Sequence, residues 1–214
     1  MIPLLVALSL AQPPTVPDSP GVVETPHYYL VLFGSDAGPL RPARTHTWAT
    51  YAKADGHHLV EHVTISWLPA DLVINTLRPR RPEAGANLGL ADTFRFVLDQ
   101  GQKVTLFGPY EVDAARFAVA QTERELLDGG RVSYRAASSP GGMPPGLANC
   151  ITAVGSVEPA VARRIPVRQY GRRGTAKAAR EIVTEGTAVR TADAEWLLPA
   201  LGLDPTTLDR SPKR

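Results

Sequence analysis

The alternation of apolar and polar positions predicts three strands in the first part of the chain. The segment HYYLVLF, residues 27–33, is rich in aromatic and branched side chains and is typical of a buried strand. Residues 45–54, THTWATYAKA, predict a second strand, and residues 57–69, HHLVEHVTISWLP, predict a third. Between them stands Asp55-Gly56, a dipeptide that favours a tight hairpin turn. We therefore expect the second and third strands to pair as an antiparallel hairpin.

The third of these strands is expected to have one apolar face. Side chains of a strand alternate between its two faces. The odd-numbered positions place Glu61 among four apolar residues, which are Leu59, Val63, Ile65 and Trp67. The other face carries His58, Val60, His62, Thr64 and Ser66.

Helical patterns dominate the second part of the chain. We expect helices over residues 91–101, 113–130, 175–186 and 191–202, strands over residues 103–112 (bent at Gly108-Pro109) and 131–138, and loops over residues 34–44, 78–90 and 139–146. Asp92 or Thr93 is expected to cap the first helix and Asp113 the second. The apolar members of the second helix are Phe117, Val119, Leu126 and Leu127. Strands that cluster before the helices indicate an α+β class, with an antiparallel sheet packed against helices.

The first 24 residues have the composition of a leader and a tether. Residues 1–11, MIPLLVALSLA, are almost wholly apolar, are too few to span a bilayer, and end in the small residues that precede a signal-peptidase cut. Residues 12–24 are rich in proline and predict an extended tether. We expect residues 25–214 to form one domain with a C-terminal helical extension. The protein is then exported, to the periplasm, cell envelope or medium, with no integral membrane segment after cleavage.

Charge is unevenly placed along a chain whose formal net charge is only +2. The segment Arg163–Arg180 carries seven basic residues and no acidic one, and residues 78–81, RPRR, form a shorter basic cluster. One interpretation is a binding surface for an anionic partner such as an envelope polymer or a lipid surface. The other is a solvated helix face and loop. Aromatic residues are not interleaved with these charges, so nucleic acid is not an expected partner.

A single cysteine, Cys150, stands in the stretch GLANCITAV. A lone thiol cannot form a disulfide within the chain. Asn149 is a good N-cap, and the spacing of Ile151, Val154 and Val157 makes Cys150 the first residue of a helix. The free amides and the dipole at that end of a helix favour the nucleophilic thiolate. The alternative is that Cys150 packs as a small buried hydrophobe.

A thiol nucleophile needs a base within hydrogen-bond reach and a group that orients the base. Among the five histidines, His46 in the second strand is the candidate base and His62 in the third strand the orienting partner, because the hairpin can bring these strands together. Glu61 is the alternative orienting group. A metal site built on His57, His58 and His62 is a weaker interpretation, since His-Glu-x-x-His spacing is missing. We expect no cofactor.

The order of these residues resembles that of the circularly permuted NlpC-type, papain-like superfamily. This superfamily includes exported cell-wall amidases and peptidases and the lecithin:retinol acyltransferase group. In its members, histidine strands precede a helix that in several branches opens with Asn-Cys, as Asn149-Cys150 does here. The resemblance spans roughly residues 28–157. It implies a papain-like fold with Cys150 as nucleophile, His46 as base and His62 as the third polar residue.

These residues support two functions. In the first, the Cys150 thiolate attacks an amide or ester carbonyl of an envelope substrate, His46 protonates the leaving group, and water or another acceptor resolves the thioester. The protein is then a cysteine amidase, peptidase or acyltransferase. In the second, a papain-like scaffold without catalysis binds an anionic envelope partner through the basic C-terminal region. The second function predicts a buried Cys150 more than about 7 Å from every histidine.

Overall fold

A computed structural model describes residues 25–38, 42–75, 77–138, 142–158, 171–184, 189–190 and 192–210. The predicted leader and tether, residues 1–24, lie outside the described residues, and so does the first part of the basic segment, residues 163–170. Among the described helices, none is both long and apolar enough to cross a membrane.

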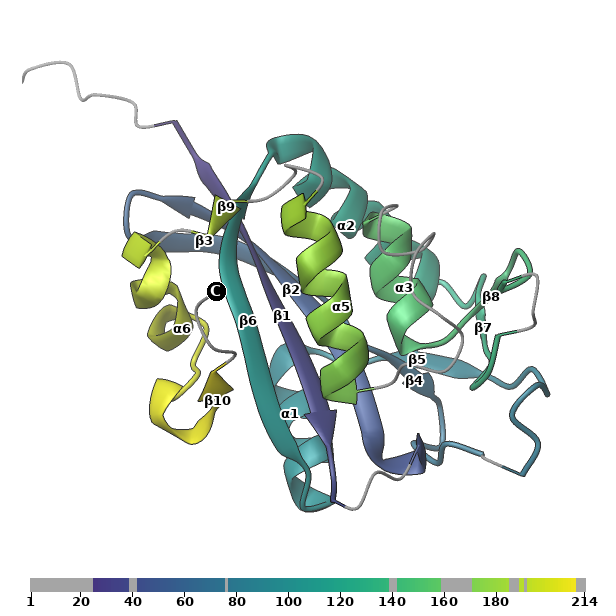
Figure 1. The fold of residues 1–214 in the computed structure, drawn as a ribbon. Helices are drawn as coiled ribbons and strands as arrows, with labels where there is room; N and C mark the ends of the chain where they lie inside the picture. Colours follow the sequence, from purple (N-terminus) through teal and green to yellow (C-terminus); the bar gives the residue numbers. More distant parts are fainter. Residues whose placement is uncertain are drawn as a thin grey trace, which may run out of the picture.

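A central sheet organises the fold (Figure 1). Its strands lie side by side in the order β10, β6, β1, β2 and β3, and β9 also pairs with β6. The pairing of β10 with β6 is parallel, and the other pairings in this sheet are antiparallel. The strands are β1 His27–Asp36, β2 Thr45–Asp55, β3 His58–Ile65, β6 Lys103–Val112, β9 Val189–Arg190 and β10 Asp209–Arg210. This mixed sheet, packed against helices, confirms the predicted α+β class.

The hairpin between β2 and β3 turns at Gly56 and His57, as the Asp55-Gly56 dipeptide predicted. Asp55 pairs with His58 across the turn. Gly56 has a φ of 54°, in the left-handed region that glycine adopts without steric cost. The turn therefore depends on glycine at this position.

A β-bulge follows this turn and reverses the predicted alternation at the start of β3. The register shifts between Lys53 and Ala54, so Leu59 pairs with Ala54 while Val63 pairs with Tyr51. Leu59 then packs on one face of the sheet and Val63 on the opposite face. The prediction that Leu59 shares a face with Val63 is wrong. The extra residue of the bulge shifts the alternation by one position, so the residues of β3 before the bulge point to the face opposite to the predicted one.

The predicted third strand is interrupted at Ser66. β3 ends at Ile65, and Trp67–Pro69 form a separate strand β4, which pairs antiparallel with β5, Gly85–Asn87. The Ser66 amide donates a hydrogen bond to the side-chain oxygen of Asn87 at 2.7 Å. β5 thus lies within the segment predicted as a loop, because three residues are too few to display an alternating pattern.

The predicted strand over residues 131–138 is largely irregular. Only Ser133–Tyr134 form a strand, β7, and it pairs in parallel with β8, Leu147–Ala148. This short ladder holds the chain that leads into the cysteine helix.

Helix α2, Ala114–Asp128, begins and ends as predicted. The side chain of Asp113 caps the first turn, and Gly129 is the C-cap. Phe117 is buried in the core. Val119, another apolar member of the predicted pattern, is 45% exposed and does not belong to the core.

Helix α1, Leu90–Asp99, starts before the predicted cap. Its N-cap is Gly89, which makes no side-chain cap bond. The buried hydroxyl of Thr93 donates to the Gly89 carbonyl at 2.8 Å, from inside the helix. The expected caps Asp92 or Thr93 are wrong, because burial of Leu90 against the sheet extends the helix by one turn.

The remaining helices are short or begin earlier than predicted. α3 spans Cys150–Val157 and α5 spans Gly171–Thr184. The helix expected over residues 191–202 is a 3₁₀ segment, η2 Ala192–Trp196, followed by one α-helical turn, α6 Leu197–Ala200. Pro199 lacks the amide that a continuous helix would need there. Two further 3₁₀ turns are η1, Pro42–Arg44, and η3, Pro205–Thr207.

Helices cover both faces of the sheet (Figure 1). Helices α2, α3 and α5 lie on one face, which we call the α5 face, and α1 and α6 lie on the other, which we call the α1 face. The core of the α5 face includes Tyr51, Val63, Phe117, Val154 and Ile182. The core of the α1 face includes Phe33, Trp48, Val97, Leu197 and Leu198.

Gly34 of β1 lets α5 approach the sheet closely. A Cβ atom at this position would lie 2.5 Å from the hydroxyl of Thr175 and 2.9 Å from the Cα of Arg172, both on α5. No side chain fits between these two backbones. The position of α5, with its basic residues, therefore depends on this glycine.

We predict that Gly34→Ala lowers the free energy of unfolding by about 1–3 kcal/mol, because α5 must shift away from β1. Urea unfolding measures the change. Gly38→Ala is the matched control, since a Cβ at Gly38 has no neighbouring atom within 4 Å. Equal stability of the two variants would contradict the close packing of α5 on β1.

Candidate functional site

Strand β2 is buried on both faces, and its alternation decides where the predicted site residues lie. His46 points to the α1 face, where its ring stacks on Trp48 with a centroid distance of 5.4 Å. Thr47 points to the α5 face, where its hydroxyl lies 2.9 Å from that of Thr175. Neighbouring residues of a strand point to opposite faces. A residue of β2 that contacts α3, the helix that begins at Cys150, must therefore point to the same face as Thr47.

Cys150 lies on the α5 face at the first residue of α3, as predicted. The Asn149 side chain accepts from the amide of Thr152 at 3.0 Å, and the Thr152 hydroxyl accepts from the amide of Asn149 at 2.8 Å, which completes a capping box. Burial raises the pKa of the Cys150 thiol to about 11, although backbone hydrogen bonds from Thr47, Ile151 and Cys150 itself partly oppose the rise. The thiol is protonated at neutral pH, so the expected thiolate is not favoured here.

His46 is fully buried on the α1 face. Its Nε2 atom lies 2.9 Å from the Ser66 hydroxyl, and its Nδ1 atom has no hydrogen-bond partner among the described residues. The Ser66 hydroxyl also lies 2.8 Å from the hydroxyl of Thr93 on α1. Burial lowers the His46 pKa to about 3, so the imidazole is neutral at physiological pH. His46 thus belongs to a buried polar cluster between β2 and α1.

His62 is exposed and lies far from His46 along the sheet. It pairs with Ala52, six residues beyond His46 on β2, which corresponds to about 20 Å at the rise of a strand. Partial burial is the main cause of its lowered pKa. Glu61, the alternative orienting group, accepts a hydrogen bond from Gln121 of α2 at 2.9 Å.

The structure therefore does not bring the predicted nucleophile and base together. Cys150 and His46 lie on opposite faces of the sheet, with the backbone of β2 between them, and His62 reaches neither. The catalytic roles of these three residues stay predictions that this arrangement does not favour. In the part of the chain that the structure describes, no group of three or more His, Cys, Asp or Glu side chains could hold a metal ion.

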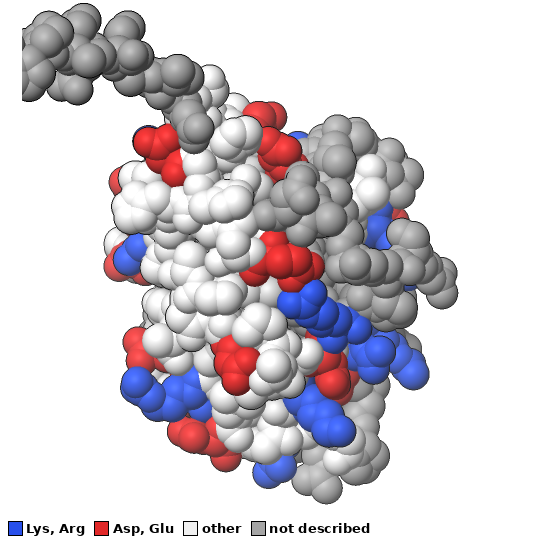
Figure 2. Space-filling view, turned by 90° about the vertical axis from the view of Figure 1, so that its left-hand side faces the viewer, with Lys and Arg blue, Asp and Glu red and all other residues white. Residues whose placement is uncertain are grey.

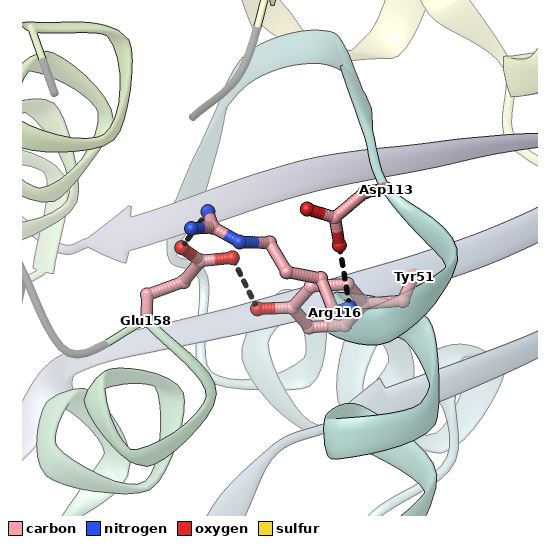
Figure 3. A network of polar contacts seen from close by, with 4 residues as sticks. All are labelled: Tyr51, Asp113, Arg116 and Glu158. Atoms are coloured by element: carbon pink, nitrogen blue, oxygen red, sulfur yellow. Dashed lines mark hydrogen bonds and ion pairs between the residues drawn. The ribbon is translucent and has the colours of Figure 1, made fainter. Parts of the chain in front are cut away.

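A buried ion pair lies at the opposite end of α3 (Figure 3). Glu158, the C-cap of α3, has a side chain that is 1% exposed. Its carboxylate accepts from a guanidinium N–H of Arg116 on α2 at 2.5 Å and from the Tyr51 hydroxyl on β2 at 3.3 Å. Arg116 also donates its backbone amide to Asp113, the N-cap of α2, at 2.8 Å. These contacts tie α2 and α3 to the sheet.

Burial raises the pKa of Glu158 to about 7, although the Arg116 charge and the Tyr51 hydrogen bond both lower it. Burial, together with the Glu158 charge, raises the pKa of Tyr51 well above its ordinary value. Shifts of this kind occur at functional sites and equally in structural ion-pair networks. Both carboxylate oxygens of Glu158 have protein partners, and through them the network joins α2 and α3 to β2.

The sequence patterns indicated neither the buried cluster around His46 and Ser66 nor the buried cluster around Glu158. Glu158 directly follows the apolar run of α3, where a charged residue is normally read as the start of a solvated loop. Ser66 had a fainter signal, since it is a small polar residue between Ile65 and Trp67 in an otherwise apolar run.

The described part of the basic segment lies on α5. Its basic side chains belong to Arg172, Arg173, Lys177 and Arg180. Among the described residues, none of these four forms an ion pair. The face of the molecule that carries α6 and β10 differs, because acidic and basic side chains are interspersed on it (Figure 2). There, Arg210 pairs with Glu195 at 2.6 Å.

No protein family, curated protein or solved structure matches the chain. The resemblance to the permuted papain-like superfamily stays a prediction. It rests on the order of the elements, since the helix that opens with Asn149-Cys150 follows and contacts β2, the strand that carries His46.

We predict that Cys150 reacts with iodoacetamide slowly at neutral pH and about tenfold faster with each pH unit up to about pH 10, because its pKa is about 11. Intact mass spectrometry measures the rate. The His46→Gln variant is expected to give the same pH profile, since His46 lies on the opposite face. A thiol that reacts at about pH 6 in the native chain but not in this variant would contradict these positions.

We predict that Glu158 makes the protein less stable as the pH rises. Its pKa is about 7 in the folded chain against an ordinary value of 4.5, so folding favours the protonated form. Stability is then lost between about pH 4.5 and pH 7, by about 3 kcal/mol in total. Urea unfolding at the two ends of this pH range should show that the free energy of unfolding falls more in the native chain than in Glu158→Gln. Glu125→Gln, an exposed position on α2, is the control, and equal losses in all three proteins would refute the assignment.

Proposed function

We propose that the chain is an exported, non-catalytic domain that binds an anionic polymer of the cell envelope through the basic side of α5. The observation that carries the proposal is that one side of α5 is buried in the core and the other side is exposed and basic. Ala178 and Ile182 are buried in the core, whereas Arg172, Arg173 and Arg180 are exposed. A helix anchored on one side in this way offers fixed cationic groups to a partner on the other.

The placement of these charges does not serve the stability of the helix. Arg172 and Arg173 lie in the first turn of α5, where no acidic residue is present. The positive end of the helix dipole disfavours cations at this position. An anionic partner at this end of α5 would be attracted both by the two arginines and by the positive end of the helix dipole.

The geometry around the cysteine supports binding over catalysis. Cys150 is protonated at neutral pH, and the nearest strand offers it a backbone amide rather than an imidazole. His46 is engaged with Ser66 on the opposite face of the sheet. Within the described residues, the hydrogen bonds that act on the Cys150 thiol come from backbone groups, and a thiol without a base in reach is a poor nucleophile. Cys150 then serves as a packing residue at the start of α3.

The scaffold in this proposal is a permuted papain-like domain, and the apolar residues 1–11 act as its export signal. The support for the scaffold is the antiparallel strand order before a capped Asn-Cys helix, and the support for export is the composition of the N-terminus. A cysteine hydrolase or acyltransferase is the second candidate. It is favoured by the capping box, which leaves Cys150 at the amide-rich end of α3.

We predict that replacing Arg173, Lys177 and Arg180 by Gln weakens binding to an anionic polymer such as dextran sulfate by about tenfold or more at low salt. The binding should also lose most of its salt dependence, because exposed charges are screened by salt. Fluorescence titration of the full chain at several salt concentrations measures both effects.

The matched control replaces Arg95, Lys103 and Arg124 by Gln. This change removes the same number of charges from exposed positions on α1, β6 and α2. Equal weakening by the two triple variants would show that only net charge matters and would overturn the assignment to α5. Hydrolysis of an amide or ester substrate that Cys150→Ala abolishes would instead favour the cysteine enzyme.

A further inference from the structure

The longest loop of the molecule within the described residues connects β4 to β5 and projects beyond them (Figure 1). Its base is closed by a hydrogen bond from the amide of Ala70 to the carbonyl of Ala84 at 2.9 Å. Further out, the amide of Ala137 donates to the carbonyl of Pro79 at 2.8 Å. At the stem, Glu83 exchanges backbone hydrogen bonds of 2.9 and 2.8 Å with Tyr134, so the loop is attached to residues 134–137 at two points.

The outer part of this loop presents apolar side chains to solvent. Leu77 is 93% exposed and Val73 is 63% exposed. The Asn75 side chain accepts hydrogen bonds from the backbone amides of Leu77 at 3.1 Å and Arg78 at 2.9 Å, which constrains the backbone of the loop here. Single exposed apolar residues are common on protein surfaces, so these two matter here because they stand on one projecting loop together with basic residues.

Basic side chains adjoin these two apolar residues. Arg78, Arg80 and Arg81 are all exposed. The carboxylates of this loop, on Asp71 and Glu83, lie at its stem. Burial and the charge of Asp71 raise the pKa of Glu83, and the charge of Arg81 partly opposes the rise. Within the described residues, Arg78 and Arg80 form no ion pair. The outer part of the loop is therefore cationic as well as apolar.

We infer that this loop docks the protein on an anionic lipid bilayer. Leu77 and Val73 enter the boundary between headgroups and acyl chains, and the neighbouring arginines bind lipid phosphates. A projection with two apolar side chains is far smaller than the roughly 800 Å² that each partner buries in a stable protein interface. It suits a fluid surface that closes around each inserted side chain. The inference does not depend on the proposed binding of a polymer by α5.

The test is binding of the full chain to phosphatidylcholine vesicles with and without about one-third phosphatidylglycerol, measured by co-sedimentation. Leu77→Asp is expected to lower the partition coefficient on anionic vesicles about tenfold or more. Each of Arg78→Gln and Arg80→Gln is expected to lower it about fivefold on anionic vesicles and much less on neutral ones. Leu98→Asp on α1, at a position 56% exposed, is the matched control and should leave the coefficient unchanged.

A second measurement locates the contact independently of affinity. A tryptophan introduced by Leu77→Trp should shift its emission to the blue when anionic vesicles are added, whereas one introduced by Leu98→Trp should not. The absence of a shift for Leu77→Trp, or equal loss of binding for Leu77→Asp and Leu98→Asp, overturns the inference. The loop variants should bind dextran sulfate as the native chain does. A negative result with vesicles would therefore not contradict the proposal that α5 binds an anionic polymer.

Discussion

The rest of the structure depends on one strand, β2, being buried on both of its faces. Every residue from Thr45 to Ala52 is buried, so each side chain must find a partner on the face to which its parity assigns it. The α5 face receives Thr47 and Tyr51, and the α1 face receives His46 and Trp48. No side chain of β2 can change sides without moving all the others. This constraint, more than the spacing of reactive residues, decides which groups can meet.

The polar residues of β2 make the register of the core specific. The Thr50 hydroxyl lies 3.0 Å from that of Thr64 on β3, and the Tyr51 hydroxyl reaches Glu158 on α3. Thr47 meets α5 and His46 meets Ser66 beyond β3. Buried polar groups lose free energy when they are left without partners, so a strand that slips by one position loses several hydrogen bonds at once. The pairing partners on three different elements thus act together to fix the position of this strand.

Local signals in the sequence predicted local structure well. Asp113 and Gly129 marked the ends of α2, Asp55-Gly56 marked the hairpin, and Asn149 marked the start of α3. The cysteine site could not be predicted in the same way, because a helix pattern does not say which face of a sheet the helix will cover. The bulge in β3 opposite Lys53 and Ala54 had no sequence signal either, yet it moved Leu59 to the opposite face. Tertiary packing decided both outcomes.

The parallel pair of β10 with β6 has a consequence for how the protein reaches this fold. Asp209 pairs with Thr105, so one margin of the central sheet is covered by a segment about a hundred residues further along the chain. During synthesis the backbone groups of β6 at Thr105 and Leu106 stay without these partners until that segment has been made. Unpaired edges invite pairing with other chains. The incomplete chain therefore exposes part of an edge that the finished fold covers, and this edge can pair with another chain until β10 is in place.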